Sequence, residues 1–154
     1  MTMKCLWNQL LLWSSSLLLG GTVYFSFLMA PVLFRAFGRE EAGKITTVLF
    51  DNYYLLALAC GSVLLGCGLT ALRPLTLPRA AVLTGLALLI LLCTAVAQFG
   101  LRPAMQEVRH TDPPRFRALH GMSMVLNLLV MLSAGTTVAM APGWIRNPKA
   151  AQHP

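Results

Sequence analysis

The chain has 154 residues, of which 56% are hydrophobic and only 11% are charged, and its formal net charge is +7. Soluble domains carry about 25% charged residues, so this composition excludes an ordinary water-soluble domain. A basic chain can indicate nucleic-acid binding, but these Lys and Arg residues gather at the ends of apolar stretches, where they contact lipid headgroups, and we expect no nucleic-acid partner.

Four apolar stretches predict four membrane-spanning helices. A bilayer core about 30 Å thick is crossed by about 20 apolar helical residues, and in lipid only helices and closed barrels satisfy every backbone polar group. The stretches cover roughly residues 10–34, 45–72, 80–101 and 116–141. The sequence therefore predicts an all-α, four-helix up-down bundle that forms one domain, 1–154, in a multi-pass protein of the cell membrane. The side that the termini face stays open, because basic residues flank the spans on both sides.

The first stretch, 10–34, contains small residues suited to close helix packing. Ser16 and Gly20 are four residues apart and share a helix face, and Gly21 follows directly, so we expect another helix to approach here. Pro31, near the end of the stretch, predicts a kink. The apolar run is longer than the roughly 7–15 residues of a signal-peptide core, so we expect a retained span.

The second stretch, 45–72, begins with polar and aromatic residues around Asp51 and Tyr54, as is typical of a membrane boundary. Gly61 and Gly66 predict a second small-residue packing surface. Cys60 lies in the same stretch, but the chain has no CxxC motif, and a buried Cys usually packs as a small hydrophobe. We therefore expect no redox or metal site from the cysteines.

The third stretch, 80–101, ends in a polar stripe. Gln98, Arg102, Gln106 and Arg109 recur at helical spacing, which places them on one helix face as it leaves the bilayer. Pro103 predicts a bend at this exit. Farther along, Asp112 precedes two prolines, and an Asp N-cap followed by Pro indicates a helix that starts at about residue 113.

The fourth stretch, 116–141, carries polar side chains on one face. His120, Ser123, Met124 and Asn127 follow a spacing of three or four residues. Polar groups inside membranes are costly and usually face the interior of a bundle. In an up-down bundle, the first and third spans end on the side where the second and fourth begin. The sequence therefore predicts a polar pocket at one membrane face, for which the candidates are Asp51, Tyr54, Gln98, Arg102, His120, Ser123 and Asn127.

Contacts within this pocket depend on helix rotation, and we expect Asp51 to lie near Arg102 or His120. A metal site is the alternative use of the fourth span, because the imidazole of His120 and the thioether of Met124 suit Cu(I), and a His can also bind haem iron. Our first prediction is that the protein binds no cofactor. Phosphate-binding, dinucleotide-binding and HExxH metalloprotease motifs do not occur, so no catalytic residue is predicted.

Several of these residues also carry a resemblance. The chain is similar to the transmembrane protein 205-like family, a group of membrane domains of unknown function. The matching pieces are Ala30-Pro31-x-Leu33-Phe34, Leu49-Phe50-x-x-Tyr53-Tyr54, Arg102-Pro103 with Arg109, and Phe116-x-x-Leu119-His120-Gly121-x-Ser123-x-x-x-Asn127-Leu128. The resemblance implies a four-span membrane protein of unassigned biochemistry. Asp51 stands where the family usually has a proline, so its role is particular to this chain. The layout also resembles copper-resistance D-like proteins and the haem-associated protoporphyrinogen oxidase of bacteria, but those carry a His in the first span and this chain has none.

Three functions follow as hypotheses. The first is a non-enzymatic scaffold or partner subunit in the lipid bilayer, which forms a homo-oligomer or binds other membrane proteins through its small-residue faces. The second is a haem- or copper-handling membrane protein that uses His120. The third is a pathway for small solutes or ions, built by oligomers around the polar pocket.

Overall fold

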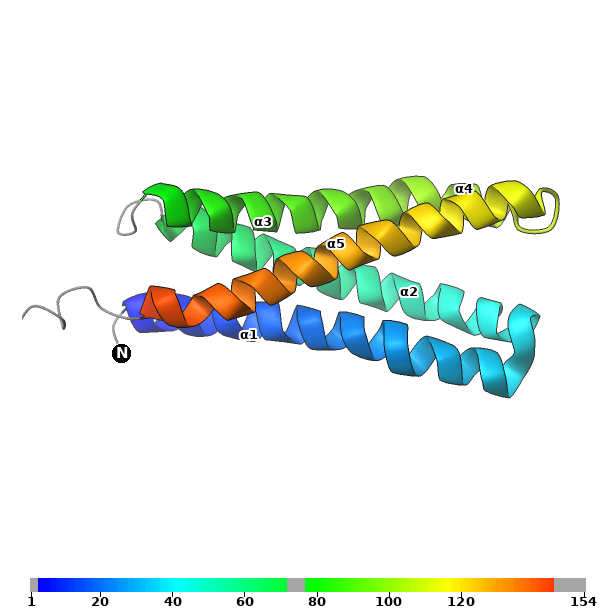
Figure 1. The fold of residues 1–154 in the computed structure, drawn as a ribbon, viewed down its shortest axis with the longest axis horizontal. Helices are drawn as coiled ribbons and strands as arrows, with labels where there is room; N and C mark the ends of the chain where they lie inside the picture. The colour runs from blue at the N-terminus through cyan, green and yellow to red at the C-terminus, as the bar shows by residue number, and fades with distance from the viewer. Residues whose placement is uncertain (1–2, 72–76, 146–154) are drawn as a thin grey trace, which may run out of the picture.

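The computed structural model describes residues 3–71 and 77–145, and these are helical apart from a turn at residues 109–112 (Figure 1). In this part of the chain there is no strand, so the prediction of an all-α protein is confirmed for it. The elements, with η for a π-helical turn, are α1 (Met3–Val23), η1 (Tyr24–Met29), α2 (Ala30–Ala71), α3 (Leu77–Ala95), η2 (Val96–Leu101), α4 (Arg102–Val108) and α5 (Pro113–Ile145).

The chain reverses its direction at Gly38, inside α2. The backbone there has φ 72° and ψ 178°, a conformation that glycine adopts easily because it lacks a Cβ. Figure 1 shows the start of α2 continuing the line of α1 and the rest of α2 running back beside it. We call residues 3–37 the first limb and residues 39–71 the second limb.

The described residues contain three helical stretches long and apolar enough to cross a membrane, where four were predicted. These are Leu6–Thr70, Arg79–Val108 and Pro113–Ala141. The count differs because the predicted loop at 35–44 is helical except at Gly38, which merges the first two predicted spans into one stretch. The end of the second predicted span, and much of the predicted loop at 73–79, lie outside the described residues.

Both predicted proline bends take the form of π-helical turns. Each turn ends two residues before a proline, η1 before Pro31 and η2 before Pro103. A proline lacks an N–H group and its ring collides with the carbonyl four residues earlier, so the helix widens locally. The wider hydrogen bonds are present at both places, from the Ala30 N–H to the Phe25 carbonyl and from the Arg102 N–H to the Ala97 carbonyl.

The start of α5 agrees with the predicted cap. α5 begins at Pro113, and the Asp112 carboxylate accepts a hydrogen bond from the backbone N–H of Arg115 at 3.1 Å. This bond satisfies one of the unpaired donors in the first turn of the helix.

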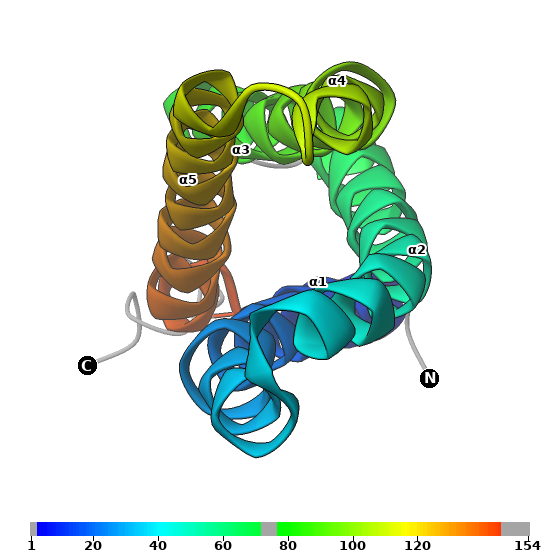
Figure 2. The ribbon, with the colours of Figure 1, turned by 90° about the vertical axis from the view of Figure 1, so that its right-hand side faces the viewer.

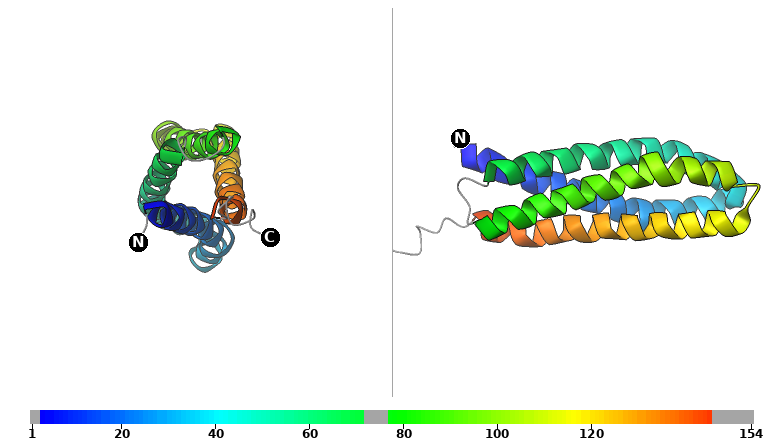
Figure 3. Two further views of the ribbon diagram at one scale, coloured as in Figure 1. Left: turned by 90° about the vertical axis from the view of Figure 1, so that its left-hand side faces the viewer. Right: turned by 90° about the horizontal axis from the view of Figure 1, so that it is seen from above.

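The helices close into a ring. α1 packs against α2 and α5, and α3 packs against the same two helices. Figures 2 and 3 show this arrangement along the long axis, with α1 opposite α3 and α2 opposite α5. The start of α1 and the end of α5 lie at the same end of the molecule, and the reversal within α2 and the turn between α4 and α5 lie at the other (Figure 1).

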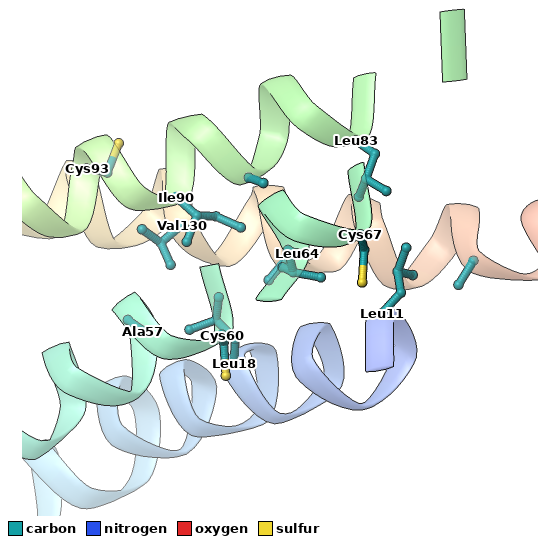
Figure 4. Close-up of a cluster of buried hydrophobic side chains, with 13 residues drawn as sticks. Leu11, Leu18, Ala57, Cys60, Leu64, Cys67, Leu83, Ile90, Cys93 and Val130 are labelled. Carbon is teal, nitrogen blue, oxygen red and sulfur yellow. The ribbon is translucent and has the colours of Figure 1, made fainter. Parts of the chain in front are cut away.

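The main apolar core fills only the half of the ring nearer the start of α1 (Figure 4). Leu18, Leu64, Leu83 and Ile90 are at most 1% exposed. The members of this core are Leu11, Leu18, Ala57, Cys60, Leu64, Cys67, Leu83, Ala87, Ile90, Cys93, Val130, Ala134 and Ala141. We call residues 11–22, 57–67, 83–93 and 130–141 the packed half, and residues 23–54 and 97–127 the polar half.

The predicted small-residue surfaces are only partly used inside the chain. A Cβ at Gly61 would lie 2.9 Å from Leu91 Cδ2 and 3.1 Å from Ile90 Cγ2, so α2 and α3 approach closely there. Gly21 is near Leu56, at 3.6 Å from such a Cβ. Gly20 and Gly66, by contrast, have no atom within 4 Å of an added Cβ. No described helix of this chain packs against Gly20 or Gly66, so the expected approach of another helix at these two glycines stays a prediction.

Ser16 is exposed with Gly20, while the neighbouring Ser15 is fully buried. The reason is helix rotation. α1 turns Ser15, Leu18 and Thr22 towards the core, which places the face of Ser16 and Gly20 on the outside.

Candidate functional site

Arg102 lies at the centre of a polar cluster that joins the second limb to η2 and α4. Its guanidinium forms a salt bridge with Asp51, through Nη1 to Oδ1 and through Nη2 to Oδ2, the latter at 2.8 Å. Nη2 also donates to the Thr47 carbonyl at 2.9 Å, and Nη1 donates to Gln98 Oε1 at 3.1 Å. Gln98 Nε2 donates to Asp51 Oδ1 at 3.5 Å. We call these four residues the ion-pair cluster.

The ion-pair cluster is more open to the outside on its acidic side than on its basic side. The Arg102 side chain is 16% exposed, whereas the Asp51 side chain is 58% exposed. Both Nη atoms of Arg102 are engaged, and its Nε is buried without a hydrogen-bond partner among the described residues. The guanidinium therefore has no accessible donor left for a ligand.

The rest of the predicted polar stripe continues towards the turn at 109–112. Arg109 Nη2 donates to the Glu40 carbonyl at 3.4 Å, and a Cβ at Gly43 would overlap its guanidinium. The absence of a side chain at Gly43 thus makes room for this contact. On the outer side of the stripe is an open groove of about 280 Å³, lined by Gln98, Phe99, Arg102, Pro103 and Gln106.

A second group of hydrogen bonds links three helices in the interior. The Tyr53 hydroxyl donates to Asn127 Oδ1, and Asn127 Nδ2 donates to Ser26 Oγ at 2.9 Å. The Tyr53 and Thr22 hydroxyls lie 3.3 Å apart. The first limb, the second limb and α5 each contribute at least one of these groups. We call Thr22, Ser26, Tyr53 and Asn127 the hydroxyl–amide network.

Aromatic rings pack around this network. Phe25 of η1 lies 4.9 Å from Phe50 and 5.5 Å from Tyr53, and Phe50 lies 5.5 Å from Tyr54, between ring centroids. Such tilted and stacked pairs contribute about 0.5–1.5 kcal/mol beyond the burial of their area. The rings shield the hydrogen bonds from the outside.

A small, partly open space lies between the second limb, α3, η2 and α5. Its volume is about 10 Å³, and Tyr54 and Ser123 line it. A single water molecule needs roughly 10–15 Å³ by this measure, so the space has room for about one water and for no organic substrate. The full lining is Tyr53, Tyr54, Cys93, Thr94, Ala97, Ser123, Leu126, Asn127 and Val130.

The structure separates His120 and Met124 from the other pocket candidates. His120 is exposed and stacks on Phe116, with ring centroids 6.1 Å apart, and Met124 is 62% exposed. His120 and Asn127 are seven residues apart and share a face of α5. The first limb contacts this face at Asn127, through Ser26, and leaves His120 and Met124 uncovered. No group of three or more His, Cys, Asp or Glu side chains within residues 3–71 and 77–145 could hold a metal ion.

Sequence reasoning missed four participants in these contacts. Tyr53 was interpreted only as a boundary aromatic, and Thr22, Ser26 and Thr47 were not singled out. Ser26 lies in the π-helical turn before Pro31, which changes the rotation of the helix at that point. The sequence contains a signal that could have indicated Ser26. Each predicted proline bend has a polar residue five positions earlier, Ser26 before Pro31 and Gln98 before Pro103.

The arrangement of these side chains is more typical of contacts that join helices than of a catalytic site. The polar groups of the ion-pair cluster bond largely within that cluster, and those of the hydroxyl–amide network bond within that network. The space lined by Tyr54 and Ser123 is too small for a substrate. Each group of contacts joins helices that are distant in sequence. Both therefore act as interhelical links at the level of the two π-helical turns.

Comparisons with known proteins found a matching family and a relative of similar sequence. A family described as "Domain of unknown function (DUF4149)" matches residues 13–114, which include the whole ion-pair cluster. An uncharacterized protein of Aquifex aeolicus (strain VF5) is 31% identical over 117 residues, a region that covers 76% of this chain and 83% of the relative. No solved structure matches the chain.

Proposed function

The chain belongs to the family described as a domain of unknown function (DUF4149), and from this premise and the geometry of its interior we propose that it is a non-enzymatic scaffold or partner subunit of a membrane. The description of the family assigns no reaction. The observation that carries the proposal is the interior, in which the side chains of the hydroxyl–amide network bond to one another beside a space of only about 10 Å³.

The proposed topology has four passes through the cell membrane. The stretch Leu6–Thr70 has 65 residues, which as a helix measure about 98 Å at ~1.5 Å per residue, and a single crossing of a ~30 Å core cannot accommodate it. Two passes with the reversal at Gly38 between them do. The similarity to the transmembrane protein 205-like family implies the same topology. We propose that the chain belongs to that family, on the basis of the motifs given above.

The surface for a partner is the outward small-residue face of the first limb. Ser16 and Gly20 are exposed, four residues apart, and Gly20 has open space where a Cβ would point. Small residues at this spacing let the backbones of two helices approach closely, which favours helix association in lipid. A second copy of this chain or another membrane helix fits this face.

A matched pair of glycine variants tests the proposal. Gly20→Leu adds a side chain on the outside, so the bundle should stay folded while association is lost. Gly61→Leu adds the same side chain where Leu91 and Ile90 leave no room, so the bundle itself should lose stability. Gly85→Leu, at an exposed position of α3 with open space where a Cβ would point, is the control for an added apolar side chain alone.

The measurement is crosslinking of the full chain in native membranes, with thermal unfolding of the purified protein in mild detergent alongside. Loss of crosslinked species for Gly20→Leu at an unchanged melting temperature supports the proposal. Association that persists in Gly20→Leu contradicts it. Elemental analysis of the same preparations is an independent test. Iron or copper that is stoichiometric in the wild type and absent from His120→Ala would assign the protein to cofactor handling instead.

A further inference from the structure

The open groove beside the ion-pair cluster is large enough for a small ligand group. Its volume is about 280 Å³, and its lining residues all belong to η2 and α4. The space lined by Tyr54 and Ser123 has room for about one water, whereas this groove approaches the roughly 300 Å³ of a small ligand site. The lining residues are Gln98, Phe99, Arg102, Pro103 and Gln106.

The lining of the groove changes from apolar to polar along its length. Phe99, in η2, is 70% exposed, and Gln106, seven residues later in α4, is exposed as well. From Phe99 the chain runs towards the turn between α4 and α5, and Figure 1 shows α4 near that end of the molecule. Phe99 is therefore nearer the centre of a bilayer and Gln106 nearer its boundary. A phospholipid has the same order, with acyl chains inside and its headgroup at the boundary.

Asp51 of the second limb brings a negative charge to the side of the groove. Its carboxylate accepts hydrogen bonds from two of the lining residues, from both Nη atoms of Arg102 and from Nε2 of Gln98. An ionised carboxylate can accept about four hydrogen bonds, and these contacts use three of them. Because the Asp51 side chain is 58% exposed, the remaining capacity is open to a ligand from the outside.

The positive charge of the cluster is less available. Both Nη atoms of Arg102 are engaged, and its side chain is only 16% exposed. Among the described residues, no other Lys, Arg or His lines the groove. Charge complementarity therefore favours a ligand with a cationic group that donates hydrogen bonds, and it disfavours an anionic one.

We propose that this groove binds phosphatidylethanolamine, a phospholipid whose headgroup carries a primary ammonium. The ammonium donates a hydrogen bond to Asp51, the Gln106 amide donates to the phosphate, and an acyl chain packs on Phe99. A lipid is favoured over a partner protein because the groove runs from apolar to polar in the direction of a lipid that lies across the membrane boundary. The inference uses the proposed membrane crossing of Arg79–Val108 but not the proposed scaffold role.

Lipid binding to the full chain in mild detergent, measured by native mass spectrometry, tests the inference. Phosphatidylcholine is the comparison lipid, because it has the same phosphate and the same charges but its methylated ammonium has no N–H to donate. Loss of that one hydrogen bond should weaken binding about fivefold relative to phosphatidylethanolamine. Asp51→Asn should weaken binding of phosphatidylethanolamine by up to about fivefold, as expected for an exposed ion pair.

Glu107→Gln is the matched control for Asp51→Asn. Glu107 is exposed and follows Gln106 in α4, but it does not line the groove. Its substitution removes the same charge and should leave the affinity for phosphatidylethanolamine nearly unchanged. An equal loss for Glu107→Gln would overturn the inference, because the attraction would then be one of general charge. Equal binding of the two lipids to the wild type would also overturn it and would leave the groove to a protein partner.

Gln106→Ala gives a test that does not disturb the Asp51–Arg102 salt bridge. Because the amide is assigned to the phosphate, which both lipids share, its loss should weaken binding of both lipids alike, by about threefold. Unchanged binding would contradict the placement of the headgroup in the groove. Gly20→Leu should retain full lipid binding, which separates this result from that of the association test.

Discussion

The two halves of the ring are held together by different forces. In the packed half, Leu64 and Ile90 are fully buried in a continuous apolar core. In the polar half, no residue from 23 to 41 is buried. Helices are joined there by the ion-pair cluster and by the hydroxyl–amide network, which reaches Thr22 at the edge of the packed half. Van der Waals packing in the first half is spread over many atoms, whereas the links in the second depend on single side chains. We therefore expect the packed half to determine stability and the polar half to determine which helices are joined at the end near Gly38.

The largest effect should come from emptying the packed half. Leu64→Ala leaves a cavity at a side chain that is 0% exposed, and such changes cost about 2–4 kcal/mol. Thermal or denaturant unfolding in detergent micelles measures it. Leu28→Ala in the polar half, at 57% exposure, removes the same atoms and should cost less than about 0.5 kcal/mol. Equal losses for the two variants would show that the halves do not differ in packing.

The next effect concerns the hydroxyl–amide network. Asn127→Ala removes the acceptor for Tyr53 and the donor to Ser26, and hydrogen bonds between membrane helices contribute about 0.6–2 kcal/mol. Tyr53→Phe removes one of the same bonds, so the double variant should lose less than the sum of the two single losses. Additive losses would contradict a direct bond. Asn52→Ala, at an exposed position of the second limb, is the control.

A smaller effect is expected from the ion-pair cluster. Arg102→Gln and Asp51→Asn should each lower the melting temperature by less than Asn127→Ala does, because Asp51 is 58% exposed and water replaces part of the lost interaction. The double variant should fall close to either single variant, since both break one contact. A melting temperature that drops further in the double variant would mean that the two side chains stabilise the protein independently.

The smallest effect should be that of His120→Ala. His120 is exposed and touches Phe116 through a ring stack, so the change in unfolding free energy should stay within about 0.5 kcal/mol. The same unfolding assay detects it. A large loss would place His120 in the interior and return it to the predicted pocket.

The sequence predicted the polar pocket in part. Asp51, Gln98 and Arg102 meet because a stripe at helical spacing and an up-down topology restrict where these residues can lie. Tyr54, Ser123 and Asn127 line the small space instead, and none of them belongs to the ion-pair cluster. His120 shares a spacing pattern with Asn127, and periodicity alone could not reveal that the first limb covers one and leaves the other uncovered.

Apolar length, proline positions and the Asp112 cap were determined by the sequence itself, because they follow from local backbone geometry and from the number of residues that span a bilayer. The rotation of each helix was decided only by the tertiary structure. Ser15 rather than Ser16 faces the core, and Arg102 rather than His120 meets Asp51. These outcomes depend on how all the helices pack at once and on the two π-helical turns, which shift the helix faces past the prolines. No single stretch of sequence contains that information, since each helix face is selected by its neighbours.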